Sequence, residues 1–234
     1  METRQENFEY TTNVITNLRP IEKIEKNEQK IYNIIKRFMD ITGGIIGIIL
    51  LIPLTIIVYI GNMISKDSGS VFYIQRRIGA NGKYFKIYKF RTMVVGADKK
   101  LRKYLKENPE EAREYEKYKK LKNDPRITKF GMFLRKTSID EFPQFINVLK
   151  GEMSLVGPRP YLTKEKKEMG KYYRHIIKCK PGLTGIWQVS GRSNVTFTDR
   201  LELDMEYIKT KNIKTDIRLI FKTFVKIFRK EGAV

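Results

Sequence analysis

The longest apolar segment of the chain runs from Ile41 to Ser65 and contains no charged residue. At about 1.5 Å per residue, a helix of this length would reach roughly 36 Å, which is enough to cross the hydrocarbon core of a bilayer. A cleaved signal peptide fits poorly, because the apolar residues begin about forty residues into the chain. The pattern therefore predicts a helix that enters a membrane, in preference to a buried core helix.

Pro53 lies near the middle of this segment, and basic residues flank the segment on both sides. Proline lacks a backbone donor and crowds the preceding turn, so we expect a kink there. Each half would then be roughly 18 Å long, which is short for a crossing. Because the positive-inside rule favours keeping both flanks in the cytosol, we expect a re-entrant helix that dips into one leaflet and returns. The alternative is an ordinary span that tolerates its proline.

Changes in pattern divide the chain into three parts: a polar tail (1–35), the membrane-inserted helix (36–66) and a larger domain (67–234). In the larger domain, alternating positions around Asn81-Gly82 predict a β-hairpin with a left-handed turn. Residues 98–122 are dense in Lys and Glu and predict two solvated helices. The expected fold class is α+β and mainly helical.

The C-terminal stretch from Ile213 to Lys230 carries two helical stripes, one apolar and aromatic, the other basic with a repeat of four residues. This pattern predicts a basic amphipathic helix at a lipid headgroup interface. By pattern alone, a helix packed on the domain core is equally possible, and the upstream apolar segment favours the interface. The stripes are formed by Ile213, Ile217, Phe221, Phe224 and Phe228, and by Lys214, Arg218, Lys222, Lys226 and Lys230.

The chain of 234 residues has 47 Lys and Arg against 26 Asp and Glu, a formal net charge of +21. Such a charge points to an anionic partner: nucleic acid, membrane phospholipid or a phosphorylated substrate. One Cys excludes an internal disulfide framework, and one His excludes a zinc site built from several histidines. The chain also lacks the glycine-rich phosphate loop of ATPases and the dinucleotide-binding fingerprint.

Asp140 and Glu141 are adjacent carboxylates near the start of a predicted helix. Ser138 followed three residues later by Glu141 matches a capping box, and the apolar period of FPQFINVL continues the helix. One interpretation is that both carboxylates only complement the helix dipole. The other is a phosphoryl-transfer site, in which an ionised Asp140 attacks phosphorus and holds a covalent aspartyl phosphate.

Such a reaction brings anions together, so a divalent cation and basic side chains are needed to offset their repulsion. Arg135 lies just upstream of the carboxylates, whereas Arg159 and Arg192 are framed by Pro, Gly or Ser in segments poor in charge. Prolines hold the backbone around Arg159 extended, which helps to fix a bidentate phosphate contact. Trp187 has two interpretations, a platform for a base or a core residue.

Five motifs, taken in order, resemble those of the bacterial sugar transferase family, the monotopic polyprenyl-phosphate phosphoglycosyl transferases. The resemblance covers about Lys36 to Phe228. The motifs are KRFMD, GSVFYIQRRIG, FKIYKFRTM, KNDPRITKFGMFLRKTSIDEFPQFINVLKGEMSLVGPRP and KPGLTGIWQVSGRS.

The resemblance implies a re-entrant membrane helix and a catalytic domain on the cytoplasmic face of the bacterial inner membrane. Asp140 would attack the sugar-proximal phosphate of a UDP-sugar, releasing UMP, and polyprenyl phosphate would then take the sugar phosphate from the enzyme. Glu141 would assist, with Mg²⁺. The implied product, a polyprenyl-diphosphate-hexose, initiates capsule, exopolysaccharide or O-antigen synthesis.

The resemblance also assigns supporting residues. Arg135, Arg159 and Arg192 fall in motifs that contact anionic groups, and Asp204 is a weaker candidate beside Glu141 for the metal. In this chain Ile52 precedes the proline, where family members often have Ser, which removes a hydroxyl from the expected helix break. Only a polar tail precedes the membrane helix, so we expect a minimal form without extra spans.

Two other functions compete with the transferase. A membrane-anchored basic protein that binds nucleic acid or acidic partners would explain the net charge, but a membrane surface and phosphate-bearing substrates explain it better, so we expect no nucleic-acid partner. A metal-dependent phosphohydrolase would use the same carboxylates with water as acceptor.

Overall fold

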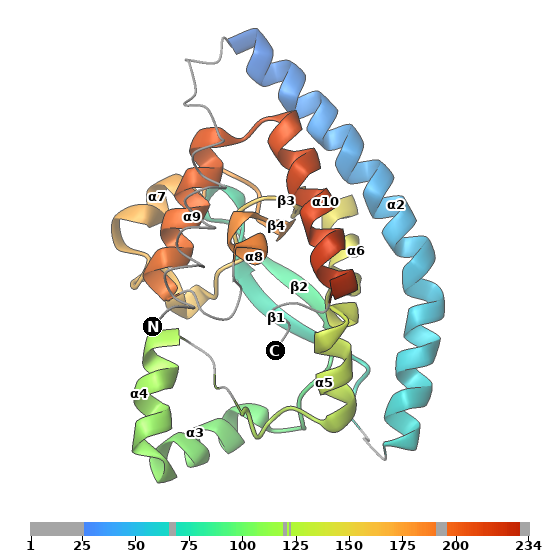
Figure 1. Cartoon of the computed structure of the whole chain (residues 1–234), viewed down its shortest axis with the longest axis vertical. Coiled ribbons are helices and arrows are strands. Elements are labelled where there is room, and N and C mark those ends of the chain that lie inside the picture. Colours follow the sequence, from blue (N-terminus) through green and yellow to red (C-terminus); the bar gives the residue numbers. More distant parts are fainter. Residues whose placement is uncertain (1–25, 66–68, 119–120, 122, 191–195, 230–234) are drawn as a thin grey trace.

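One long helix, α2, runs along the side of a smaller α+β domain in the computed structural model (Figure 1). The structure describes residues 26–65, 69–118, 121, 123–190 and 196–229. The helices are α2 (Lys26–Ile64), α3 (Ala97–Glu107), α4 (Pro109–Tyr118), α5 (Lys129–Lys136), α6 (Phe145–Lys150), α7 (Tyr173–Ile176), α8 (Ile186–Val189), α9 (Phe197–Thr210) and α10 (Ile213–Arg229). The strands are β1 (Phe72–Ile78), β2 (Tyr84–Phe90), β3 (Ser154–Val156) and β4 (Gly182–Thr184), and the 3₁₀ helices are η1 (Ala80–Gly82), η2 (Ile139–Gln144), η3 (Thr163–Lys166) and η4 (Gly170–Tyr172).

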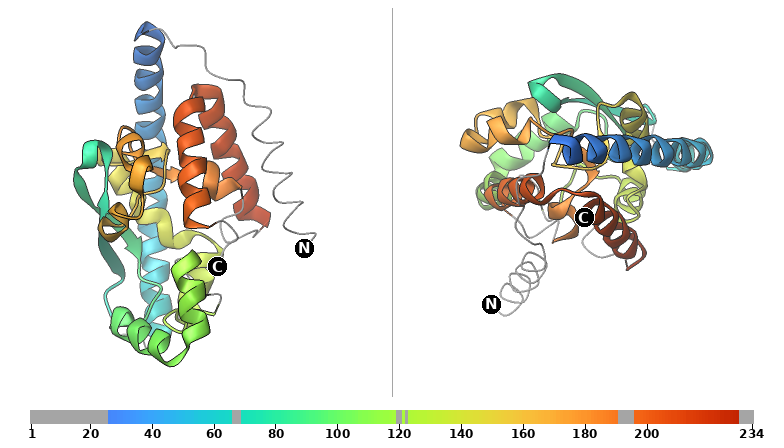
Figure 2. Two further views of the ribbon diagram at one scale, coloured as in Figure 1. Left: turned by 90° about the vertical axis from the view of Figure 1, so that its left-hand side faces the viewer. Right: turned by 90° about the horizontal axis from the view of Figure 1, so that it is seen from above.

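Helix α2 is longer and more continuous than the sequence pattern predicts. It begins at Lys26, inside the predicted polar tail, and continues through Pro53 without a break. Figures 1 and 2 show it running the height of the domain with a gentle curve. Pro53 lies on the exposed side of the helix, while Leu51 and Val58 hold the opposite side against the domain. A proline on the outer face is compatible with gradual curvature instead of a sharp kink.

Small residues let α2 approach the rest of the domain closely. A Cβ added at Gly43, Gly44 or Gly47 would lie within 3 Å of a side chain of the domain, belonging to Leu155, Leu149 and Phe145 respectively. Farther along, Leu51 and Val58 join a buried cluster with Phe90 and Leu134. The inner side of α2 is thus packed against the domain from one end of the apolar segment to the other.

The predicted β-hairpin is confirmed. Strands β1 and β2 are antiparallel, with Phe72 opposite Phe90 and Ile78 opposite Tyr84. At the turn, Asn81 and Gly82 have φ values of 55° and 73°, the left-handed region that these residue types adopt most readily.

The other predicted helices also form. The segment rich in Lys and Glu folds as α3 and α4, which meet at Asn108, and the C-terminal stretch folds as α10. Leu219 of α10 is buried, whereas Ile217, Phe221 and Phe224 remain exposed. Helix α10 therefore presents an unpartnered apolar side.

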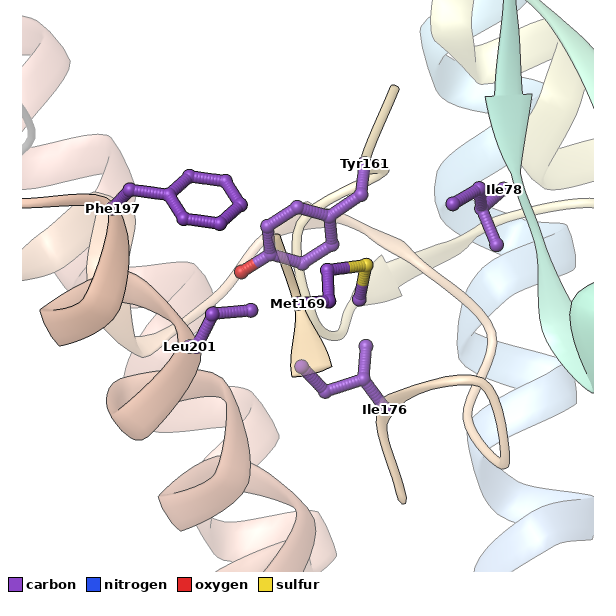
Figure 3. Packing of buried hydrophobic residues seen from close by; sticks show 6 residues of the cluster. All are labelled: Ile78, Tyr161, Met169, Ile176, Phe197 and Leu201. Carbon is purple, nitrogen blue, oxygen red and sulfur yellow. The ribbon is translucent and has the colours of Figure 1, made fainter. Parts of the chain in front are cut away.

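A buried cluster ties the hairpin to the C-terminal half of the domain (Figure 3). The Tyr161 ring packs edge-on against Phe197 of α9, and its hydroxyl points toward that helix. The short parallel pair β3–β4 lies nearby, with Ser154 opposite Gly182. This packing fixes the segment around Tyr161 against α9. The cluster is formed by Ile78, Tyr161, Met169, Ile176, Phe197 and Leu201.

Candidate active site

Asp140 and Glu141 lie in the first turn of η2, between α5 and α6. The predicted capping box is wrong: Ser138 has φ 56°, and its side chain makes no cap hydrogen bond to the turn. Its backbone N–H instead donates to the carbonyl of Arg135 at 3.0 Å, so Ser138 serves as the left-handed residue that ends α5. The carboxylates still open a helical turn, as the sequence pattern predicts.

Lys89 forms an ion pair with Glu141, with 2.7 Å between Nζ and Oε1. Lys89 lies on β2, on the same face as the buried side chains of Phe85 and Ile87. Sequence analysis missed this residue. A lysine at a position where strand alternation predicts an inward-facing side chain was the available signal.

The Asp140 carboxyl group has an elevated pKa. Burial is the main cause and raises the pKa to about 6, with the neighbouring Glu141 acting in the same direction. Lys89 and Arg135 act in the opposite direction and favour the carboxylate. Asp140 is therefore ionised at neutral pH yet poorly solvated, which is a suitable state for a carboxylate nucleophile.

Arg135 stands beside the same carboxylates. Its Nε donates to the hydroxyl of Thr92 at 2.9 Å, which fixes the orientation of the guanidinium. Burial lowers the pKa of Arg135, and the charge of Asp140 raises it in compensation. Lys89 and Arg135 thus supply the positive charge that an anionic substrate needs in order to approach Asp140.

The remaining predicted residues lie elsewhere. Arg159 donates its backbone N–H to Asp204 at 3.0 Å, and its guanidinium lies 5.2 Å from the centre of the Trp187 ring. Arg192 is outside the described residues. Asp204 is fully buried and accepts the Tyr161 hydroxyl at 2.7 Å, whereas Glu141 pairs with Lys89.

A metal could be held at the adjacent carboxylates. Within the described part of the chain, no three His, Cys, Asp or Glu side chains come together. Mg²⁺, however, is commonly bound through one or two carboxylates and completed by substrate phosphates. Asp140 and Glu141 fit such a site. Asp204 fits it less well, because Oδ2 already accepts two hydrogen bonds.

Replacing Lys89 with Gln tests the electrostatic role of this residue. Without the ammonium, the pKa of Asp140 rises further, so the carboxylate ionises only at higher pH. If Asp140 is the nucleophile that the resemblance implies, its attack should slow by about tenfold at pH 6 and by less at pH 8. The measurement is the rate of covalent adduct formation against pH. Lys86→Gln, which removes an exposed charge from the same strand, should keep the wild-type profile. An equal loss at every pH would show that Lys89 does not act through the pKa of Asp140.

Comparison with known proteins places the chain in a family. A model described as bacterial sugar transferase matches residues 31–230. The chain is 46% identical over 200 residues to an uncharacterized sugar transferase of Haemophilus influenzae and 44% identical over 199 residues to the undecaprenyl-phosphate galactose phosphotransferase of Salmonella typhimurium. It is 40% identical over 198 residues to the exopolysaccharide production protein ExoY of Sinorhizobium fredii.

These alignments cover 86%, 85% and 85% of this chain and 42%, 41% and 87% of the respective relatives. The chain therefore spans less than half the length of the first two relatives and most of the length of the third. The match of the family model begins within the first turns of α2 and ends one residue after α10. The chain belongs to the bacterial sugar transferase family.

Proposed function

We propose that the chain is a membrane phosphoglycosyl transferase, which moves a hexose-1-phosphate from a UDP-sugar to polyprenyl phosphate and thereby initiates exopolysaccharide, capsule or O-antigen synthesis. The observation that carries the proposal is Asp140, a half-buried carboxylate with a pKa of about 6, flanked by Lys89 and Arg135. The printed names of two relatives, which refer to undecaprenyl-phosphate galactose transfer and to exopolysaccharide production, support the substrate classes.

The first half-reaction is attack by Asp140 on the sugar-proximal phosphorus of the donor. A bond forms between a carboxylate oxygen and this phosphorus, the bond to the bridging oxygen breaks, and UMP leaves with that electron pair. Lys89 and Arg135 attract the diphosphate to the carboxylate and offset charge on the transferring phosphoryl group. Magnesium held by Glu141 would supply further charge neutralisation. In the second half-reaction, the acceptor phosphate attacks the same phosphorus and frees Asp140.

The proposal is tested with purified protein, Mg²⁺ and a panel that includes UDP-glucose, UDP-galactose and their N-acetylated forms. We expect one donor to release UMP and to leave a phosphosugar on residue 140, detected by mass spectrometry. Continued turnover should require polyprenyl phosphate. Turnover without the lipid acceptor would instead indicate a phosphohydrolase, and no UMP release with any donor would overturn the proposal.

We also propose that α2 enters one leaflet from the cytoplasmic side without crossing the membrane. By length and composition, α2 is long and apolar enough to span a bilayer. Its outer side exposes a row of large apolar residues, including Ile45, Ile49, Ile52 and Ile56. Its inner side is packed against the domain, as far along as Gly61 on Phe130. A complete crossing would draw α5 and α6 into the hydrocarbon, so shallow insertion of the outer side fits the packing better.

Helix α10 is proposed to lie at the headgroup interface beside α2. The exposed side chains of Ile217, Phe221 and Phe224 would enter the acyl boundary, and the basic residues of the helix would face anionic lipid. The first turn of α10 is joined to α2 by the ion pair between Asp216 and Lys36, at 2.6 Å. This contact would hold both elements at the same membrane surface.

Cysteine labelling at Lys30 and Ser65 tests this topology. Both positions are exposed at opposite ends of α2. In a Cys179→Ser background, Lys30→Cys and Ser65→Cys should both react with a membrane-impermeant maleimide only when the cytoplasmic side is accessible. Labelling from opposite sides would show a true span and would contradict the proposal.

A further inference from the structure

Two arginine side chains from distant parts of the sequence lie against Trp187, and a third, Arg77, lies near one of them. The guanidinium carbons of Arg159 and Arg200 lie 5.2 and 5.6 Å from the centre of its ring, within cation–π distance. Arg77 of β1 donates to the carbonyl of Pro160 at 2.8 Å, next to Arg159 in the chain. We call Arg77, Arg159 and Arg200 the arginine cluster.

Nearby carboxylates do not neutralise two of these arginines. Arg77 and Arg159 form no ion pair within the part of the chain that the structure describes. The acidic neighbours, Asp204 and Glu165, are buried. Asp204 accepts from Tyr161 and from a backbone N–H through Oδ2, while its Oδ1 is buried without a partner among the described residues and makes no contact with an arginine. Glu165 accepts the backbone N–H of Leu162 at 2.6 Å. Arg77 and Arg159 therefore keep positive charge that no carboxylate offsets by direct contact.

Several polar atoms at the cluster also lack hydrogen-bond partners. The Nε atoms of Arg77 and Arg159, the indole N–H of Trp187 and the hydroxyl of Ser190 are all buried and unpartnered. Trp187 and Ser190 lie one helical turn apart, and the Ser190 residue is only 8% exposed. Buried donors almost always find an acceptor. Four donors without one, beside three cations, point to an anionic ligand rich in oxygen.

Burial and, to a smaller extent, mutual repulsion lower the pKa values of the arginines. Burial, followed by the charge of Arg159, lowers the pKa of both Arg77 and Arg200 to about 10. Both side chains remain charged at neutral pH. A bound anion would offset the repulsion between these positive charges.

The hairpin connects the cluster to the nucleophile. Arg77 pairs with Phe85, and Lys89 lies four residues farther along β2 on the same face. At about 3.3 Å per residue, these positions are roughly 13 Å apart, a separation that long side chains reaching inward can shorten. Arg77 is also close enough to Glu141 to respond to its charge. The two phosphates of the donor share one bridging oxygen, so the side chains of Arg77 and Lys89 must converge from the same face of the hairpin for Arg77 to contact one phosphate while Asp140 attacks the other.

We infer that the arginine cluster binds the nucleotide-side phosphate of the donor and retains UMP as the leaving group. The inference rests on the proposed function. When Asp140 attacks the sugar-proximal phosphorus, the electron pair of the broken bond stays on the bridging oxygen, which becomes part of the UMP phosphate. Negative charge grows there, and Arg77, Arg159 and Arg200 stabilise it. Trp187 holds two of the guanidinium groups in place and is not free to stack on the base.

Arg77→Gln, compared with Arg76→Gln, tests the inference. Arg76 is the adjacent residue of the same strand, exposed, and held over the ring of Tyr84. We expect Arg77→Gln to weaken UMP binding by about 10- to 100-fold, as is typical of a lost charge-assisted hydrogen bond, and Arg76→Gln to leave it unchanged. Titration calorimetry with UMP measures this without turnover. Arg159→Lys is the second variant, for the case that Arg77→Gln fails to fold. It keeps the positive charge but loses the paired N–H donors of the guanidinium, so it should also weaken UMP binding.

The two half-reactions distinguish the donor from the lipid acceptor as the source of the phosphate. Arg77→Gln should slow adduct formation from the UDP-sugar, while a preformed adduct should pass to polyprenyl phosphate with the wild-type dependence on acceptor concentration. Unchanged UMP binding in both variants, or a loss confined to the acceptor step, would overturn the inference. A third outcome separates the two proposals. If the wild-type protein forms no adduct but binds UMP, and Arg77→Gln weakens that binding, the phosphate site is supported and the proposed reaction is overturned.

Discussion

Replacing Asp140 with Asn is expected to abolish the phosphosugar adduct and, at the same time, to stabilise the folded protein at pH 7 to 8. Loss of the nucleophile removes the covalent route, so we expect UMP release to fall by at least about a thousandfold. The gain in stability follows from burial of the carboxylate, which the amide side chain tolerates better because it carries no charge.

The pH dependence of this stability effect has a definite sign. The folded state raises the pKa of Asp140 from 3.8 to about 6, which means that folding disfavours the ionised form. The cost is absent below about pH 4, grows as the pH rises through 6, and is then constant, corresponding to at most about 3 kcal/mol. Asp140→Asn should therefore be more stable than the wild type at pH 7.5 and should lose this advantage near pH 4.

Unfolding in urea, followed by the fluorescence of the single Trp187 in detergent micelles, measures the difference. Glu141→Gln is the matched control. Glu141 is partly exposed and paired with Lys89, so its substitution should bring no gain in stability. An Asp140→Asn variant that still forms an adduct would remove Asp140 from the nucleophile role, and one that is less stable than the wild type at pH 7.5 would contradict the burial argument.

The second large effect is expected at the buried ion pair that joins α2 to α10. Lys36 Nζ lies 2.6 Å from Asp216 Oδ2 and 3.1 Å from the hydroxyl of Tyr207, and Tyr32 donates to the same carboxylate. The Asp216 side chain is 1% exposed. Lys36→Met leaves this carboxylate buried without its cation, so we expect a loss of about 3–5 kcal/mol in the free energy of unfolding.

A double-mutant cycle separates the loss of the pair from the loss of a single charge. Asp216→Asn should recover much of the stability in the Lys36→Met background, because it removes the buried unpaired charge and its amide oxygen still accepts one of the two tyrosine hydroxyls, which in the wild type donate to different carboxylate oxygens. Lys30→Met removes an exposed charge from the same helix and should change stability by less than about 0.5 kcal/mol. Equal effects of Lys30→Met and Lys36→Met in urea unfolding would mean that the pair contributes little.

Local sequence patterns were enough to predict the hairpin, the two charged helices and the amphipathic α10, because turn residues and periodic polarity act over a few positions. They were not enough at Ser138, where the end of the preceding helix decided the conformation. Nor did they predict the unbroken course of α2 through Pro53, which depends on contacts with distant residues such as Phe90 and Leu134.

The candidate site shows the same division. Asp140 and Glu141 were identified from the sequence because they are neighbours in a helix-start pattern. Lys89 joins them only because β2 places it there. Arg200 meets Arg159 only through packing on Trp187, and Arg77 comes near Arg159 through its hydrogen bond to Pro160. In a chain with 47 basic residues, nothing local distinguishes Arg77 and Arg200 from the rest, and only strand alternation distinguishes Lys89.

The glycine-lined contact between α2 and α6 bears on how this protein can be handled in the laboratory. Deleting the apolar helix to obtain a water-soluble fragment would uncover Phe145 and Leu149, which follow the turn carrying Asp140 and Glu141. It would also remove Leu51 and Val58 from the buried cluster that they form with Phe90 and Leu134. Such a truncated fragment should aggregate or lose the geometry of its carboxylates, so preparations that keep the helix in micelles or nanodiscs are the ones in which activity is measurable.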